Sequence, residues 1–201
     1  MRQKFLTPKA EWQEVAIGEF LTAHSEKVGS RDIEPVAVGV MGIRKRSEIY
    51  AKELSEDYSG NKVLRVNQIC FGMGTREIVY AVLLEDAVYC VSPAYKIFNV
   101  INIEPLIIES ILMLNNKKLS ERYMIVSARQ GKSVDFSNLV KEIIQIPSNA
   151  EQRKIVSILL GQQQLIDKNE LLLAKVQQQQ KHLIENLLTG KVPVKITGET
   201  A

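Results

Sequence analysis

The order of apolar and polar residues between positions 33 and 119 is that of short strands. Apolar runs rich in β-branched and aromatic residues are separated by Gly, Asn, Asp or Pro, which is typical of strands joined by turns. Two stretches differ and favour helices: residues 47–58, with apolar residues among charges, and residues 105–114, which are almost entirely apolar. The predicted strands are 36–40, 62–66, 68–71, 77–84, 87–91 and 95–100. The chain is therefore expected to have an α+β fold that is rich in sheet.

The pattern becomes helical after Pro147. Ser148 or Asn149 is expected to cap a long helix that carries Glu151 in its first turn and ends near Gly190. Seam positions recur at alternating spacings of four and three, which is the heptad pattern of a coiled coil. The predicted seam residues are Ile155, Leu159, Gln162, Ile166, Asn169, Leu173, Val176, Gln180, Leu183 and Leu187. We predict a domain at 1–149, a coiled-coil helix at 150–190 and a polar tail at 191–201.

The length of this helix indicates a partner. At 1.5 Å per residue it runs roughly 58 Å, which exceeds the roughly 30–40 Å diameter of a domain of about 150 residues. Part of the seam is therefore expected to meet another chain or another copy. Gln162, Asn169 and Gln180 place polar groups in the seam, where such residues specify register and partner orientation.

The composition fits one core with an appended element. The chain has 201 residues, of which 45% are hydrophobic, and its net charge of +3 does not by itself indicate a nucleic-acid binder. Cys70 and Cys90 lie in apolar, strand-like stretches and are predicted to be buried free thiols. Because no apolar run approaches the ~20 residues that span a bilayer, and the N-terminus lacks the apolar region of a signal peptide, we expect a cytoplasmic protein.

Patterns of catalytic residues are weak in this chain. Residues 92–95, Ser-Pro-Ala-Tyr, resemble the loop with which amino-methyltransferases hold a flipped base, but Ala94 departs from it and no cofactor loop accompanies it. We interpret residues 92–95 and the Gly-Met-Gly run at 72–74 as turns. The only histidines are His24, in a predicted loop, and His182, on the coiled coil, which are too few for a triad or a multi-histidine metal site. Scattered carboxylates form no nuclease motif, so we predict no catalytic residue, metal ligand or cofactor in this chain.

Positive charge is concentrated in two stretches. Residues 112–132 contain five basic residues against one acid, and residues 44–46 form a basic run in a predicted loop. Basic residues on the loops of a sheet-rich domain indicate DNA binding, since Arg can pair with guanine and Lys neutralises phosphate. For any single one of them, a solvated surface charge is the simpler interpretation. The predicted DNA contacts are Arg44, Lys45, Arg46, Arg76, Lys117, Lys118, Arg122, Arg129, Lys132 and Ser133.

Four segments resemble the specificity subunit of type I restriction-modification systems. Residues 146–155 are similar to the opening of its conserved repeat, in which Ile-Pro is followed by Glu-Gln-x-x-Ile, and residues 187–191 are similar to its Leu-Leu-Thr-Gly-Lys close. Residues 12–20 resemble the start of a target recognition domain, and residues 91–98 resemble its Val-Ser-Pro-x-Tyr segment. The resemblance covers nearly the whole chain and is most specific in its last third.

The resemblance implies a non-catalytic subunit that recognises DNA. Its expected partners are double-stranded DNA, a modification subunit that binds S-adenosylmethionine and methylates adenine, and a restriction subunit. Since a full subunit has two recognition domains and two helices, one of each implies a form that pairs with itself or with another specificity chain, or else a truncated product. Two-fold pairing predicts a palindromic bipartite target, with a spacer because the helix exceeds one DNA turn of about 34–36 Å.

The main alternative is a non-enzymatic scaffold whose α+β domain binds protein and whose helix only oligomerises it. The basic residues alone leave both interpretations open. A DNA reader predicts salt-dependent binding and preference for one bipartite sequence, whereas a scaffold has neither property.

Overall fold

The computed structural model describes residues 6–51, 55, 57–127 and 131–191. The chain forms two compact units, the first up to Val156 and the second from Ser157 onward, and each is described by itself. The first unit combines short antiparallel strands with a few helices, so the predicted α+β fold is confirmed.

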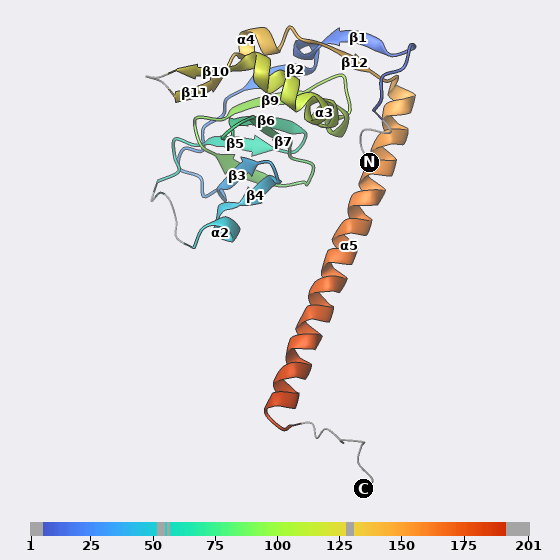
Figure 1. Ribbon diagram of the computed structural model, residues 1–201. Helices are drawn as coiled ribbons and strands as arrows, with labels where there is room; N and C mark the ends of the chain where they lie inside the picture. Colours follow the sequence, from blue (N-terminus) through green and yellow to red (C-terminus); the bar gives the residue numbers. More distant parts are fainter. Residues whose placement is uncertain (1–5, 52–54, 56, 128–130, 192–201) are drawn as a thin grey trace. The chain divides into compact units, whose positions relative to one another are not determined.

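A four-stranded antiparallel sheet is the centre of the first unit (Figure 1). Its strands, in spatial order, are β2 (Leu21–His24), β9 (Lys96–Val100), β6 (Gln68–Met73) and β7 (Ile78–Val82). Two further antiparallel pairs join β3 (Val36–Gly39) to β4 (Gly42–Lys45) and β5 (Lys62–Arg65) to β8 (Val88–Val91). Apolar side chains from the sheet and from both pairs form one core, in which Val36, Leu64 and Val91 are fully buried. This core forms because the strands that meet there contribute buried β-branched and aliphatic residues to it.

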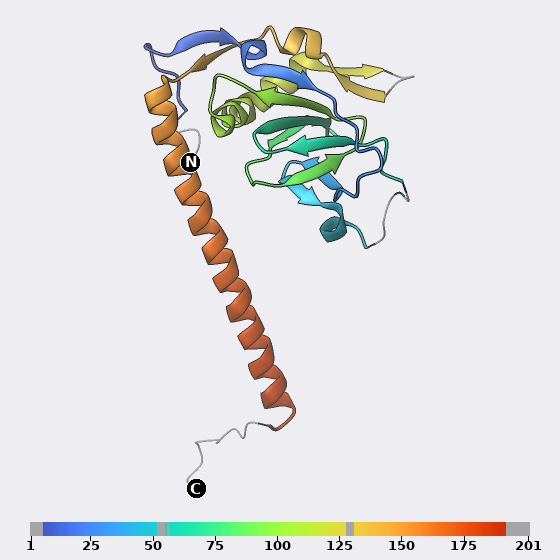
Figure 2. The same cartoon turned by 180° about the vertical axis from the view of Figure 1, so that it is seen from behind.

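Helix α3 (Pro105–Tyr123) covers the edge of the sheet at β7 (Figures 1 and 2). The backbone N–H of Ile78 donates to Ser120 Oγ at 2.9 Å, and that of Val82 donates to Glu109 Oε1 at 2.9 Å. An open strand edge otherwise offers unpaired backbone groups to other chains. Two polar residues of an otherwise apolar helix face therefore accept hydrogen bonds from two backbone N–H groups of β7.

The two ends of the first unit meet in a separate strand pair. Strand β1 (Gln13–Ala16) pairs antiparallel with β12 (Ile143–Ile146), and the 3₁₀ turn η1 (Ile17–Phe20) follows β1. The backbone N–H of Gly18 donates to the Val140 carbonyl at 2.7 Å, just after the short helix α4 (Phe136–Leu139). A Cβ at position 18 would lie 2.9 Å from that carbonyl oxygen, so the approach requires glycine.

Strands β10 (Met124–Ser127) and β11 (Gly131–Val134) form a two-stranded ribbon between α3 and α4. Its register pairs Ile125 with Ser133 and Val126 with Lys132. Val126 is 71% exposed, and Lys132 and Ser133 are also exposed, so much of the ribbon faces solvent.

Helix α5 (Asn149–Leu188) has 40 residues. The Glu151 N–H donates to Ser148 Oγ at 3.4 Å, and Gly190, with φ +70°, follows the last turn, so both predicted ends are confirmed. Within the first unit, Gln152 and Ile155 are buried. From Ser157 onward most apolar side chains are exposed. Among the predicted seam residues of this part, Leu159 is buried and Gln162 is partly exposed. The polar residues Asn169 and Gln180 are exposed. The apolar seam residues further along are between 39% and 57% exposed: Ile166, Leu173, Val176, Leu183 and Leu187.

The six predicted strands are present, each with one or both bounds shifted by one or two residues. The helix predicted at 47–58 is wrong in its described first part, because α2 (Arg46–Ile49) has only four residues and the backbone turns extended at Tyr50. Residues 52–54 and 56 of this prediction lie outside the described residues. None of the four residues of α2 is buried, so burial does not stabilise this helical turn. The helix predicted at 105–114 is confirmed but continues to Tyr123. The turn at residues 92–95 is confirmed by the Tyr95 N–H, which donates to the Ser92 carbonyl at 3.0 Å.

Candidate DNA interface

The basic run at 44–46 lies on a strand and a helical turn, so its placement in a loop is wrong. Arg44 and Lys45 belong to β4, and Arg46 begins α2. Lys45 Nζ lies 2.9 Å from Glu34 Oε2, and this hydrogen bond raises the pKa of Lys45. The guanidinium of Arg46 lies 5.9 Å from the centre of the Tyr58 ring. Arg44 is exposed and makes no ion pair in the part of the chain that the structure describes.

The second predicted group lies mainly on helix α3 and not on a loop. Lys118 and Arg122 each lie 2.8 Å from Glu142, whose side chain is only 9% exposed. Burial acts to raise the pKa of Glu142, but hydrogen bonds from Lys118, Tyr123 and Arg122 outweigh it and hold the pKa at about 2. These two cations therefore join α3 to the start of β12, and the single carboxylate of Glu142 compensates their charge in part.

Lys117, also on α3, is exposed, and no ion pair of it exists among the residues described. Arg129 lies outside the described residues.

Three predicted contacts come together near the ribbon. Lys132 and Ser133 lie on β11, and Lys132 Nζ donates to the Thr75 carbonyl in the turn between β6 and β7. Arg76 is the next residue in that turn and is exposed, without an ion pair to any described residue. A two-stranded ribbon is one of the elements that the major groove of DNA admits. The ribbon and the neighbouring turn thus present cations on an element of suitable size.

Lys96 joins this group although the sequence prediction did not include it. It is the first residue of β9, is exposed, and lines a cleft together with Lys132 and Ser133. A single lysine inside a predicted strand gives no charge cluster in the sequence. Its only sequence signal is its position directly after the turn at residues 92–95.

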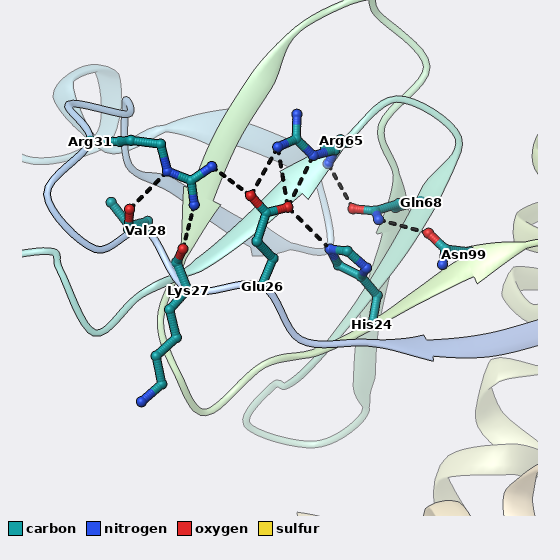
Figure 3. A network of polar contacts seen from close by, with 8 residues as sticks. All are labelled: His24, Glu26, Lys27, Val28, Arg31, Arg65, Gln68 and Asn99. Carbon is teal, nitrogen blue, oxygen red and sulfur yellow. Dashed lines mark hydrogen bonds and ion pairs between the residues drawn. The ribbon is translucent and has the colours of Figure 1, made fainter.

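Other arginines of the first unit are held by a carboxylate. Glu26 accepts from Arg31 Nη1 at 2.5 Å and from Arg65 Nη2 at 3.0 Å (Figure 3). Hydrogen bonds from Arg65 and then Arg31 lower the pKa of Glu26 to about 2. His24 Nε2 lies 3.7 Å from the same carboxylate, at the end of β2, so its predicted loop position is wrong. This network ties the loop after β2 to β5 and has a structural role.

The remaining reactive groups are buried or isolated. Burial raises the pKa of the Cys70 thiol to about 12, and Cys90 is also buried, so the prediction of buried free thiols is confirmed. Among the described residues, no group of three His, Cys, Asp or Glu side chains could hold a metal ion. In the same part of the chain, no helix is both long and apolar enough to cross a membrane.

These features define a class of proteins with an α+β domain that carries an exposed two-stranded ribbon, followed in the chain by a long helix with exposed apolar residues. The chain belongs to the family of type I restriction modification DNA specificity domains, whose model matches residues 9–180. The match begins just before Trp12 and includes most of α5. A comparison with curated proteins gives no match. The family is the DNA-recognising, non-catalytic component of these systems.

Proposed function

We propose that this chain reads one half of a bipartite DNA target and pairs with a second copy through α5. In this proposal residues 1–149 are the target recognition domain, residues 150–190 are the pairing helix, and residues 191–201 are a tail. The exposed seam of the second unit supports pairing most directly: five apolar seam residues from Ile166 to Leu187 are each at least 39% exposed. Apolar side chains at heptad spacing are stabilised when a partner helix covers them.

The polar seam residues favour one arrangement of the pair. Gln162 and Asn169 lie toward the start of the seam and Gln180 toward its end. Polar residues at such positions specify register and orientation, and we infer an antiparallel pair with two-fold symmetry. Two-fold symmetry gives a palindromic target. Because 40 residues of helix span about 60 Å, more than one DNA turn, a spacer separates the two half-sites.

The ribbon side of the first unit is the proposed DNA-reading surface. Arg76, Lys132 and Ser133 lie there together. By contrast, Lys45 pairs with Glu34, and Lys118 and Arg122 share the carboxylate of Glu142. Uncompensated cations gain most from phosphate, since they lose no existing ion pair on binding. Arg44 and Lys117 are further contacts, and Arg46 and Arg129 complete the proposed set.

The chain works with partner subunits in this proposal. It contributes sequence choice, and the modification subunit contributes S-adenosylmethionine and methyl transfer to adenine. The restriction subunit contributes cleavage. No catalytic residue or cofactor is assigned to the chain itself.

Light scattering of the purified chain, alone and with a co-expressed modification subunit, tests the proposal. We expect a dimer that recruits two modification subunits. Mapping of methylated adenines should then show that the complex methylates one palindromic bipartite sequence. A monomer that ignores the modification subunit contradicts it. A dimer that binds no DNA at low salt, with or without that subunit, identifies a protein-binding scaffold instead.

A further inference from the structure

A cleft of ≈ 320 Å³ lies between the end of β6, the turn at residues 92–95, β11 and the start of α4. Aromatic side chains form part of its wall: Phe71, Tyr95 and Phe136, with the rings of Phe71 and Phe136 centred 5.5 Å apart. Lys96 and Lys132 also line it, and its lining includes no carboxylate among the described residues. The cleft therefore has two cations, and no anion of its own lining balances them.

The turn that forms one side of this cleft is firmly fixed. Lys62 Nζ donates to the carbonyls of Pro93 and Tyr95, both at 2.7 Å. The Tyr95 hydroxyl donates to the Val38 carbonyl at 3.3 Å, which ties the turn to β3. Lys96 follows this turn directly, so its backbone position is set by contacts with two other strands. A preorganised cation loses less conformational entropy on binding than a free one.

Positive charge accumulates here beyond the two lysines of the lining. Burial and the nearby charge of Lys96 lower the pKa of Lys62. Three ammonium groups thus belong to one small region, and Arg76 lies next to the Thr75 carbonyl that Lys132 contacts. A bound anion would relieve their mutual repulsion, and aromatic walls strengthen such an interaction by excluding water.

We propose that this cleft binds a backbone phosphate of the DNA, with Lys96 and Lys132 as its contacts. The inference rests on the proposed DNA-reading function and adds Lys96 and a defined phosphate position to it. Lysine binds phosphate as a point charge, and phosphate contacts fix the register of a protein on the duplex. The ribbon that carries Lys132 is the element proposed to approach the groove. A phosphate bound in the adjoining cleft would therefore hold the ribbon at a fixed position on the duplex.

Salt dependence of binding to a mixed-sequence DNA duplex tests this assignment, because phosphate contacts do not depend on sequence. The full chain is compared with Lys96→Gln, Lys132→Gln and Lys96→Arg. Each Gln variant should reduce the slope of log K against log salt by about 0.9 per bound chain, and Lys96→Arg should retain it. Lys154→Gln, which removes an exposed lysine of α5 that does not line the cleft and is not among the proposed DNA contacts, is the matched control for loss of one charge. Circular dichroism of each variant establishes that it is folded.

The outcomes separate the two proposals. A wild-type chain that binds no duplex contradicts both the DNA-reading function and the cleft assignment. Wild-type binding with an unchanged slope in Lys96→Gln contradicts the cleft assignment alone. Calorimetry with inorganic phosphate distinguishes the source of the anion. Phosphate binding that Lys96→Gln abolishes, together with an unchanged DNA slope, would make this a site for a free anion and overturn the assignment to DNA.

Discussion

The indole N–H of Trp12 donates to the Glu151 carboxylate at 3.1 Å and joins residues that lie 139 positions apart in the chain. Trp12 precedes β1 and is buried, and Glu151 lies in the first turn of α5. Lys9 pairs with the same carboxylate. Both Trp12 and Glu151 belong to segments that resemble the specificity subunits, one at the start of the domain and one at the start of the repeat. Part of that resemblance therefore reflects a structural contact that joins the segment before β1 to the first turn of α5.

Replacing Trp12 with Phe should weaken this contact. Phe keeps an aromatic ring at position 12 but lacks the indole N–H that donates to Glu151. A hydrogen bond to a carboxylate contributes about 1.5–3 kcal/mol to the free energy of unfolding at most when it is shielded from water. We expect a loss of about 1 kcal/mol, because the Glu151 side chain is 22% exposed. Urea unfolding followed by circular dichroism measures it. A double-mutant cycle with Glu151→Ala should give non-additive losses, and simple additivity would show that the contact contributes nothing.

Gln152 illustrates a second structural role within the same repeat opening. Its side chain is 1% exposed, its Oε1 accepts from the Glu104 N–H at 3.0 Å, and its Nε2 donates to the Pro147 carbonyl at 2.9 Å. Gln152→Ala leaves buried backbone groups unsatisfied, at a cost of about 1–3 kcal/mol. Gln163→Ala, on the exposed part of the helix, is the matched control and should change the unfolding free energy by less than about 0.5 kcal/mol. Equal effects would contradict the anchoring role.

The sequence revealed most of the fold where burial dictates residue type. Strands such as β6 and β7 are buried along nearly their whole length, so their apolar runs are visible in the sequence. Strands β2 and β4 were missed because they mix polar and small residues with apolar ones at partly exposed positions. In the described part of the predicted helix at 47–58, α2 ends at Ile49, and none of its four residues is buried.

The candidate interface was only partly predictable for a different reason. A basic run is visible in the sequence, but the carboxylate that compensates it is not. Glu142 follows Arg122 by 20 residues and Lys118 by 24, and only the folded chain brings the three together. Lys96 was missed in the opposite way, since a cleft built from several segments makes a single lysine significant.

Acid should destabilise the first unit through Glu142. Its pKa falls from 4.5 to about 2 in the folded chain, so the unfolded chain binds more protons between these values. The free energy of unfolding should therefore be fully maintained above about pH 4.5 and should decline as the pH falls toward 2. Glu142→Gln removes the titrating group and should flatten this decline, as measured by urea unfolding at about pH 7, 4 and 3. An equally steep decline in the variant would show that other carboxylates, such as Glu26, dominate.

Gly72 is required by the ring of Tyr95. A Cβ at position 72 would lie 2.2 Å from Cε1 of that ring, so Gly72→Ala must displace it and with it the turn at residues 92–95. We expect a loss of about 1–3 kcal/mol in unfolding free energy, typical of overpacking, and weaker DNA binding. Gly39→Ala, in β3 with no atom within 4 Å of the added Cβ, is the control and should stay within about 0.5 kcal/mol. Similar losses in both variants would indicate a general strand effect and not a Tyr95 contact.

The register of the pairing helix can be tested with two leucines two residues apart. Leu173 is a seam residue and is 57% exposed, whereas Leu171 lies off the seam and is 58% exposed. Lysine has nearly the helix propensity of leucine, so Leu173→Lys and Leu171→Lys perturb the isolated helix alike. Burying the ammonium group that Leu173→Lys introduces into the seam would be costly, and light scattering should show a monomer for that variant and a dimer for Leu171→Lys. Dissociation in both variants, or in the Leu171 variant alone, would place the interface on another face of α5.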